Sequence, residues 1–173
     1  VFLRHTALTA SSPALTDFAL GLSAAVAAQP RQGLWQLMER LADAMPLRSG
    51  YASTPLSAAQ GFEQACGDSH ALSHAFISAA RLLGKPARHV SGYVLEPHTG
   101  EVSPQGWAEV WLDGRWASYD IQHGQAAGPC HVKLAVGMDY LDACPVRGQR
   151  MVNLASTDPI GQMLPAAQQS AQQ

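Results

Sequence analysis

Cys66 is the cysteine whose surroundings favour nucleophilic chemistry. It opens an amphipathic run that ends at Gly84, with Pro86 just beyond. Apolar side chains recur through this run at helical spacing, namely Leu72, Phe76, Ala79, Ala80 and Leu83. A helix N-terminus carries about half a positive charge, which favours thiolate over thiol. The pattern therefore predicts a buried helix with a reactive thiol at its start.

Strands are predicted immediately after this helix. Residues 87–95 alternate and are rich in Val and Tyr, as expected of a strand. A hairpin is predicted from 106–112 and 115–119, which are joined by the turn signal Asp113-Gly114. The nucleophile helix therefore leads directly into an antiparallel sheet.

A catalytic thiol also needs a base, usually histidine, and a third group that orients the base. Asp120 ends the predicted hairpin, where its carboxylate can point back over the sheet. The base is expected on the strand that enters at Trp107, but Gln105 precedes that tryptophan and no histidine lies there.

Several motifs in this region resemble the core of bacterial transglutaminase-like domains, which are papain-like thiol enzymes. The resemblance covers roughly residues 56–150. Its motifs are Cys66-x-Asp68, the run from Leu82 to Tyr93, Trp107-Ala108-Glu109-Val110, Tyr119-Asp120, Ala135-Val136-Gly137-x-Asp139-Tyr140 and Pro145-Val146-Arg147-Gly148.

The resemblance implies Cys66 as nucleophile, Asp120 as the triad aspartate and Trp107 as a tryptophan of the active cleft. The position of the triad histidine falls on Gln105. A glutamine can hydrogen-bond a thiol and an aspartate, but it cannot exchange a proton near pH 7. General acid–base transfer is typically worth about 10²–10⁴-fold in rate, so the substitution predicts strongly impaired amide hydrolysis.

Other histidines are candidates to replace the missing base. His123 follows Asp120 by three residues and can face the same cleft, and His98 lies in the loop before Gln105. His131 matches a histidine of the relatives, which implies a structural role.

Cys66, His70 and His74 have the spacing of ligands on one helix face. Zinc needs three or four ligands with supporting contacts, so packed imidazoles are the better interpretation. We expect no metal and no cofactor.

Two functional hypotheses remain from the sequence. The first is a degenerate transglutaminase-like domain that binds a peptide, an amide-containing substrate or a protein partner around Cys66, Gln105 and Asp120. The second is an active cysteine protease, amide hydrolase or acyltransferase that forms a thioester at Cys66, with His123, His98 or water as base.

The predicted fold class is α+β, a papain-like or transglutaminase-core fold with the nucleophile helix on an antiparallel sheet. Helices are predicted over 13–28 and 32–44, and Ser57 is predicted to cap a short helix. Further strands are predicted over 131–136 and near Met151–Leu154. We expect a single domain over 1–164, with its core at 56–150 and a disordered tail over 165–173.

Composition limits the compartments and partners. The chain has 173 residues, of which 47% are hydrophobic and 14% charged, and its net charge of -2 gives no reason to expect nucleic acid or a membrane as partner. The three cysteines, Cys66, Cys130 and Cys144, lack CxxC spacing and favour a reducing compartment, although a Cys130–Cys144 bridge stays open. With the family resemblance, this predicts a bacterial, cytoplasmic protein. Val1 is expected to be a processing boundary with further sequence upstream.

Overall fold

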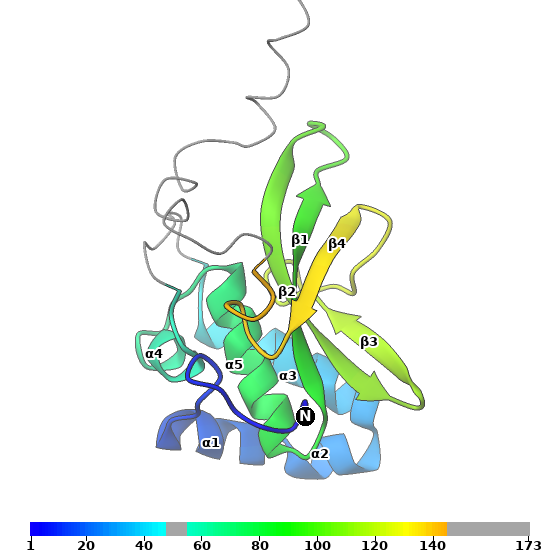
Figure 1. Cartoon of the computed structure of the whole chain (residues 1–173). Coiled ribbons are helices and arrows are strands. Elements are labelled where there is room, and N and C mark those ends of the chain that lie inside the picture. Colours follow the sequence, from blue (N-terminus) through cyan, green and yellow to red (C-terminus); the bar gives the residue numbers. More distant parts are fainter. Residues whose placement is uncertain (48–54, 145–173) are drawn as a thin grey trace, which may run out of the picture.

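The computed structural model describes residues 1–47 and 55–144, in which helices pack on an antiparallel sheet (Figure 1). The helices are α1 (Pro13–Leu20), α2 (Ser23–Ala28), α3 (Pro30–Ala44), α4 (Ala58–Glu63) and α5 (Ser69–Leu82). The strands are β1 (Ala87–Leu95), β2 (Val102–Leu112), β3 (Arg115–Tyr119) and β4 (His131–Gly137). Within the described residues the strands form one sheet of order β3-β2-β1-β4. The predicted α+β class is confirmed.

The N-terminal helical layer differs from the prediction in two respects. The single helix predicted over 13–28 is wrong, because the chain turns at Gly21 and Leu22 between α1 and α2. The turn leaves Leu22 and Val26 buried, so the apolar periodicity continues across it. Pro30 begins α3 instead of only ending the preceding helix, in keeping with proline's preference for the first helical turn.

The boundaries of α4 and α5 are set by polar caps. Ser57 and Gln60 form a capping box at α4, as the predicted cap required. At α5 the Asp68 side chain accepts a hydrogen bond from the Ala71 N–H at 2.8 Å. Because Asp68 is the N-cap, the first helical residue is Ser69, and the prediction that Cys66 opens the helix is wrong.

The sheet register places Gln105 within a strand. β2 begins at Val102, earlier than predicted, and Gln105 pairs with Gly92 of β1. The predicted β2–β3 hairpin is confirmed, with Asp113 and Gly114 both at positive φ. The predicted strand near Met151–Leu154 and the predicted tail lie outside the described residues.

Buried residues of the helical layer and the sheet share one core. α5 carries most of the contact, since its residues from Ala71 to Arg81 are buried. The Phe76 ring of α5 packs 5.0 Å from the Tyr119 ring of β3. At the N-terminal end of α5, Ser69 accepts a hydrogen bond from the Gly106 N–H of β2, next to Gln105.

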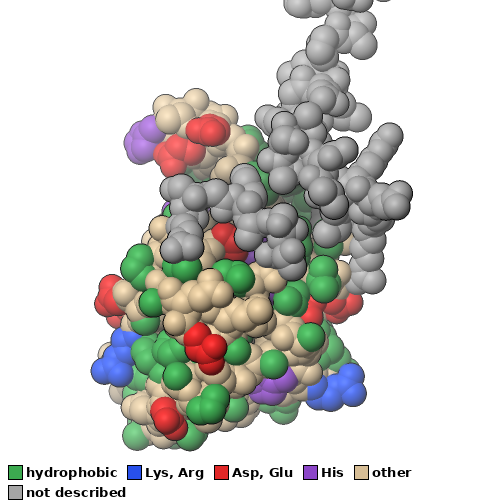
Figure 2. All heavy atoms as spheres, turned by 90° about the vertical axis from the view of Figure 1, so that its left-hand side faces the viewer, with side chains coloured by type: hydrophobic (Ala, Val, Ile, Leu, Met, Phe, Trp, Pro, Cys, Tyr) green, Lys and Arg blue, Asp and Glu red, His purple; other side chains and the backbone are tan. Residues whose placement is uncertain are grey.

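The side that carries α1 and α4 mixes side-chain types. Figure 2 shows hydrophobic groups spread over this side with separate Asp and Glu side chains among them, and Lys and Arg at its lower edges. Within residues 1–47 and 55–144, no helix is long and apolar enough to cross a membrane.

Arg81, near the C-terminal end of α5, connects separate segments of the chain. Its guanidinium donates to the Phe2, Ala87 and Met138 carbonyl oxygens and to Thr9 Oγ1, at 2.7 to 3.1 Å. Burial lowers the pKa of Arg81 to about 10, so the group stays charged at neutral pH. One buried cation therefore ties the N-terminal segment to β1 and to the turn after β4.

We predict that Arg81→Met lowers the free energy of unfolding by about 3 kcal/mol or more, because it leaves several buried acceptors unpaired. Urea denaturation measures the change. Arg40→Met on the exposed side of α3 is the matched control and should cost less than about 0.5 kcal/mol. Equal losses for the two variants would contradict a special role for Arg81.

Candidate functional site

The candidate site is organised by the Asp120 carboxylate, whose side chain is fully buried. Oδ1 accepts from Gln105 Nε2 at 3.0 Å and from the His123 backbone N–H at 3.3 Å. Oδ2 contacts His123 Nδ1 at 2.8 Å and His131 Nε2 at 2.9 Å. With four donors, both oxygens are occupied, which is how a buried carboxylate remains tolerable.

The two histidines on Asp120 have different surroundings. His131 Nδ1 accepts from the Gly128 N–H at 3.1 Å, so its Nε2 carries the hydrogen that Asp120 accepts. Its side chain is 4% exposed, consistent with a structural role. The His123 side chain is 40% exposed and donates through Nδ1, which directs Nε2 away from Asp120.

Gln105 and Trp107 are adjacent on one face of β2, and both are buried. The Gln105 amide donates to Asp120, so the predicted pairing of these two residues is present. Trp107 is 1% exposed and meets His131 edge-on, with ring centroids 5.3 Å apart. A Cβ on Gly92 would lie 2.7 Å from the Trp107 ring, so this tryptophan is packed against β1 rather than exposed to a ligand.

Ser69 is the residue of this site that the sequence analysis missed. As the first residue of α5, it accepts a hydrogen bond from the Gly106 N–H through Oγ at 3.2 Å. That N–H follows Gln105 directly along β2. The available signal was Asp68, a preferred N-cap residue that predicts a helix beginning at 69.

Cys66 lies before the helix, in a different local environment. Its backbone N–H donates to the Gly61 carbonyl at 3.2 Å, and the residue is 7% exposed. Among residues 1–47 and 55–144, no hydrogen bond joins its thiol to Gln105, Asp120 or a histidine. The structure thus brings Gln105, Asp120 and His123 together without showing a contact from Cys66 to them.

His98 does not reach this site. It lies in the exposed β1–β2 turn, beyond the Leu95–Val102 pair. Gln105 is three residues further along β2, which corresponds to about 10 Å of strand.

A separate cluster of imidazoles lies between α5 and β1. His70 Nδ1 is 3.2 Å from His89 Nε2, and the His74 and His89 rings are 5.3 Å apart. His74 joins two loops, because Nδ1 faces the Leu56 carbonyl and Nε2 accepts from the Tyr140 N–H. These contacts require a neutral His74.

Burial makes all three imidazoles hard to protonate. It lowers the pKa of His70 to about 4, lowers that of His74, and lowers that of His89 well below its usual value. Asp68 opposes the shift at His70, and Asp139 and Asp68 oppose it at His74. The helix-face interpretation of Cys66, His70 and His74 as ligands is not supported, because Cys66 precedes α5.

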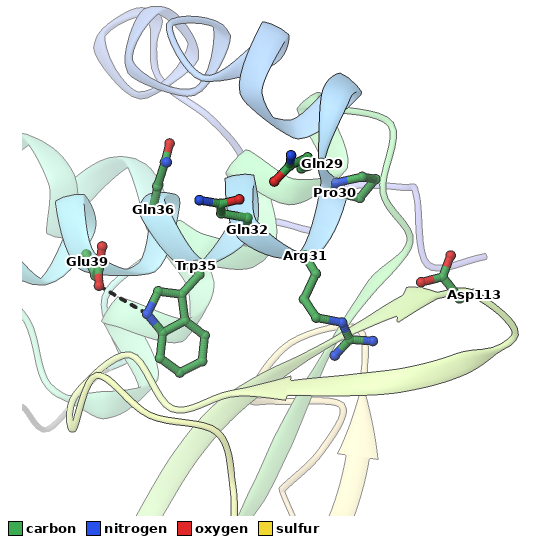
Figure 3. Close-up of a pocket in the computed structure, with 8 residues that line it drawn as sticks. All are labelled: Gln29, Pro30, Arg31, Gln32, Trp35, Gln36, Glu39 and Asp113. Carbon is green, nitrogen blue, oxygen red and sulfur yellow. Dashed lines mark hydrogen bonds between the residues drawn. The ribbon is translucent and has the colours of Figure 1, made fainter.

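The described part of the chain contains no cluster suited to a metal ion. Within it, no group of three His, Cys, Asp or Glu side chains is arranged to hold a metal ion. A shallow hollow lies elsewhere, between α3 and the β2–β3 hairpin, where Arg31 and Trp35 point toward the strands (Figure 3). Its other lining residues are Gln29, Pro30, Gln32, Gln36, Glu39 and Asp113.

Comparison with known proteins identifies the family. Residues 21–121, more than half of the chain, match the transglutaminase-like superfamily. The chain belongs to this superfamily. An uncharacterized protein of Mycobacterium leprae is 30% identical to this transglutaminase-like chain over 113 residues, which are 61% of the chain and 39% of that protein.

Solved structures agree with the fold. A candidate cysteine protease from Cytophaga hutchinsonii is 20% identical with a TM-score of 0.65, covering 83% of this chain and 48% of that one. The periplasmic domain of TgpA from Pseudomonas aeruginosa, bound to ethylmercury, is 25% identical with a TM-score of 0.51. That match covers 70% of this chain and 47% of the TgpA chain.

These matches give this chain the fold of transglutaminase-like cysteine proteases. The chain spans less than half the length of the relatives named above, so activity and partners are matters for proposal. One neighbour is a periplasmic domain, and the cytoplasmic compartment expected from the cysteines remains a prediction.

We predict that Asp120→Asn lowers the free energy of unfolding by about 3 kcal/mol, because the new amide hydrogens face histidine and glutamine donors. Thermal and urea denaturation measure this loss. Asp113→Asn is the control, since asparagine is well tolerated at the positive φ of the β2–β3 turn. Asp120→Asn with unchanged stability would show that the four contacts are not stabilising.

The imidazole cluster predicts a loss of stability in mild acid. The folded pKa values of His70, His74 and His89 lie below the unfolded value of about 6.5. The unfolded chain therefore takes up protons first as the pH falls. The free energy of unfolding should be constant above about pH 7 and should fall between about pH 6.5 and 4, by about 1.4 kcal/mol per pH unit for each neutral histidine.

Urea titrations across this pH range test the slope. His89→Gln removes one titrating group and should reduce the slope by about one proton. His98→Gln, in the exposed turn, should leave it unchanged. A wild-type stability that is flat from pH 7 to pH 5 would contradict the neutral cluster.

Proposed function

We propose that this protein is a transglutaminase-like domain that binds a peptide, an amide-containing molecule or a protein segment without hydrolysing it. The observation that carries the proposal is the 3.0 Å hydrogen bond from Gln105 Nε2 to Asp120 Oδ1. A carboxamide that cannot exchange protons near pH 7 thus holds the orienting carboxylate. In the family's mechanism a base would have to occupy that place.

The surroundings of the thiol favour the same conclusion. Cys66 precedes the Asp68 cap, so it lacks the direct approach to the helix N-terminus that favours a thiolate. No described residue forms a hydrogen bond with its sulfur that would orient it. An unoriented thiol and a neutral amide do not make a nucleophile–base pair.

The chemistry of the site favours an uncharged ligand. Gln105 is buried and neutral, and the Asp120 charge is fully used by its own four donors. A ligand carboxylate or ammonium would find no unengaged opposite charge among these groups. A backbone or side-chain amide, which offers both a donor and an acceptor, suits this environment.

One observation favours a second candidate, an active amide hydrolase or acyltransferase. His123 Nδ1 is held by Asp120 at 2.8 Å, which is the arrangement in which an aspartate orients a general base. The partly exposed imidazole would then take a proton from Cys66 or from water. Acyl transfer to the Cys66 sulfur would release the amine and form a thioester, which water would hydrolyse.

Steady-state assays decide between the two. We predict that the wild type and Cys66→Ala hydrolyse a glutamine-containing dipeptide anilide equally slowly, because neither has a positioned thiol and base. Both proteins should still bind an acetylated glutaminyl-glycine peptide. Chemical-shift changes at the backbone amides of residues 105 and 120 measure this binding.

Three variants serve as controls. His123→Gln should leave the background rate unchanged under the binding proposal. A wild-type rate at least tenfold above that of Cys66→Ala, lost in His123→Gln, would establish the enzyme instead. Gln105→Leu removes the amide and should abolish the shift changes if the peptide binds at this site.

A further inference from the structure

Ser69 is connected to the candidate site by a side-chain hydrogen bond, whereas Cys66 shows no such bond to the described residues of the site. It begins α5 immediately after the Asp68 cap, and its Oγ accepts the Gly106 N–H at 3.2 Å. Gly106 is bonded to Gln105, whose side chain reaches Asp120. Two hydrogen bonds therefore connect Ser69 of α5, through Gly106 and Gln105 of β2, to Asp120 after β3.

The packing around Gly106 explains why the helix approaches so closely. A Cβ at Gly106 would lie 2.3 Å from His70 Nδ1 and 3.1 Å from the His89 ring. Only glycine leaves room for the first turn of α5 against this part of β2. The close approach fixes Ser69, which is 7% exposed, beside the backbone of Gly106, the residue that follows Gln105.

The Ser69 hydroxyl still has a hydrogen to donate. Its oxygen is engaged by Gly106, while no acceptor for the hydroxyl hydrogen occurs among residues 1–47 and 55–144. A serine hydroxyl is both donor and acceptor, so this hydrogen is available for a ligand carbonyl.

We propose that the Ser69 side chain faces the Gln105–Asp120 pair, and that its hydroxyl donates a hydrogen bond to the carbonyl of a bound amide. Cys66 lies outside this pair. The proposal rests on the proposed binding function for its ligand, but the placement of position 69 does not depend on that ligand.

The placement can be tested by building a thiol–imidazole pair. In a Cys66→Ala background, Ser69→Cys puts a thiol at the start of α5, and Gln105→His puts an imidazole on Asp120. Proton transfer from that thiol to that imidazole would give a thiolate. With iodoacetamide the sulfur would form a bond to carbon as iodide leaves, and the proton would stay on the imidazole.

Alkylation at about pH 6 is the measurement, with the labelled residue located by peptide mass spectrometry. The Cys66→Ala/Ser69→Cys/Gln105→His protein should react at position 69 at least tenfold faster than Cys66→Ala/Ser69→Cys, because an unassisted thiol has a pKa near ~8.5 and is mostly protonated. In the otherwise wild-type chain, Gln105→His should change Cys66 labelling less than twofold.

The opposite pattern would overturn the placement. If Gln105→His accelerates Cys66 labelling tenfold and leaves position 69 unaffected, then Cys66 is the side chain that faces the pair. Equal rates at both positions with and without the imidazole would overturn it as well. Far-UV circular dichroism and thermal melting verify that each variant is folded.

A measurement on single-residue variants covers the case in which the triple variant does not fold. Ser69→Ala removes the acceptor of the Gly106 N–H, so hydrogen exchange at Gly106 should accelerate at least tenfold, whereas Cys66→Ala should leave it unchanged.

Ser69→Ala should also weaken binding of the acetylated glutaminyl-glycine peptide at least fivefold. If Gly106 exchange accelerates while peptide affinity stays the same, the placement stands and the donor role is wrong. If the wild type binds no peptide at all, the binding function fails, and the exchange and alkylation results still decide the placement.

Discussion

The burial of one carboxylate constrains most of the site. Asp120 lies out of water at the end of β3, where an unpaired charge would cost several kcal/mol. Its four donors come from β2, from the loop after β3 and from the first residue of β4. The loop between β3 and β4 must therefore cross from one edge of the sheet to the other. Asp120 thus connects strands that the sheet order keeps apart.

The second constraint is the close contact between α5 and β2. Asp68 sets the first residue of the helix, and Gly106 allows that residue to reach the strand. The same approach encloses His70 and His89, which remain neutral because they are buried. The contact thus determines both which side chain of α5 meets Gly106 and which histidines are removed from acid–base chemistry at neutral pH.

The site has the fold of the transglutaminase-like superfamily, and its one buried carboxylate is held by a neutral amide and by histidines. The fold brings a helix start, a strand and a buried aspartate close together. Gln105 donates a hydrogen bond to Asp120, and its amide offers hydrogen bonds but no proton exchange near pH 7. Fold similarity to cysteine proteases and a binding function are therefore compatible in one chain.

The sequence by itself determined the fold class and most helices and strands, and it singled out Gln105 and Asp120 as candidate site residues. Periodicity and the Asp113-Gly114 turn predicted β1, β2 and β3, because local patterns govern local structure. Apolar periodicity did not predict the break between α1 and α2, because Leu22 and Val26 are buried in the structure as they would be in one continuous helix.

Only the tertiary structure showed that the first residue of α5 contacts β2 at Gly106. A cap at Asp68 shifts the helix start by three residues from Cys66 to Ser69, and one helical turn changes which group faces the sheet. Apolar periodicity could not detect this shift, because it identifies the buried face of a helix and not its first residue. His131 likewise reaches Asp120 through the path of a loop, a contact between residues far apart in the sheet that no local sequence pattern encodes.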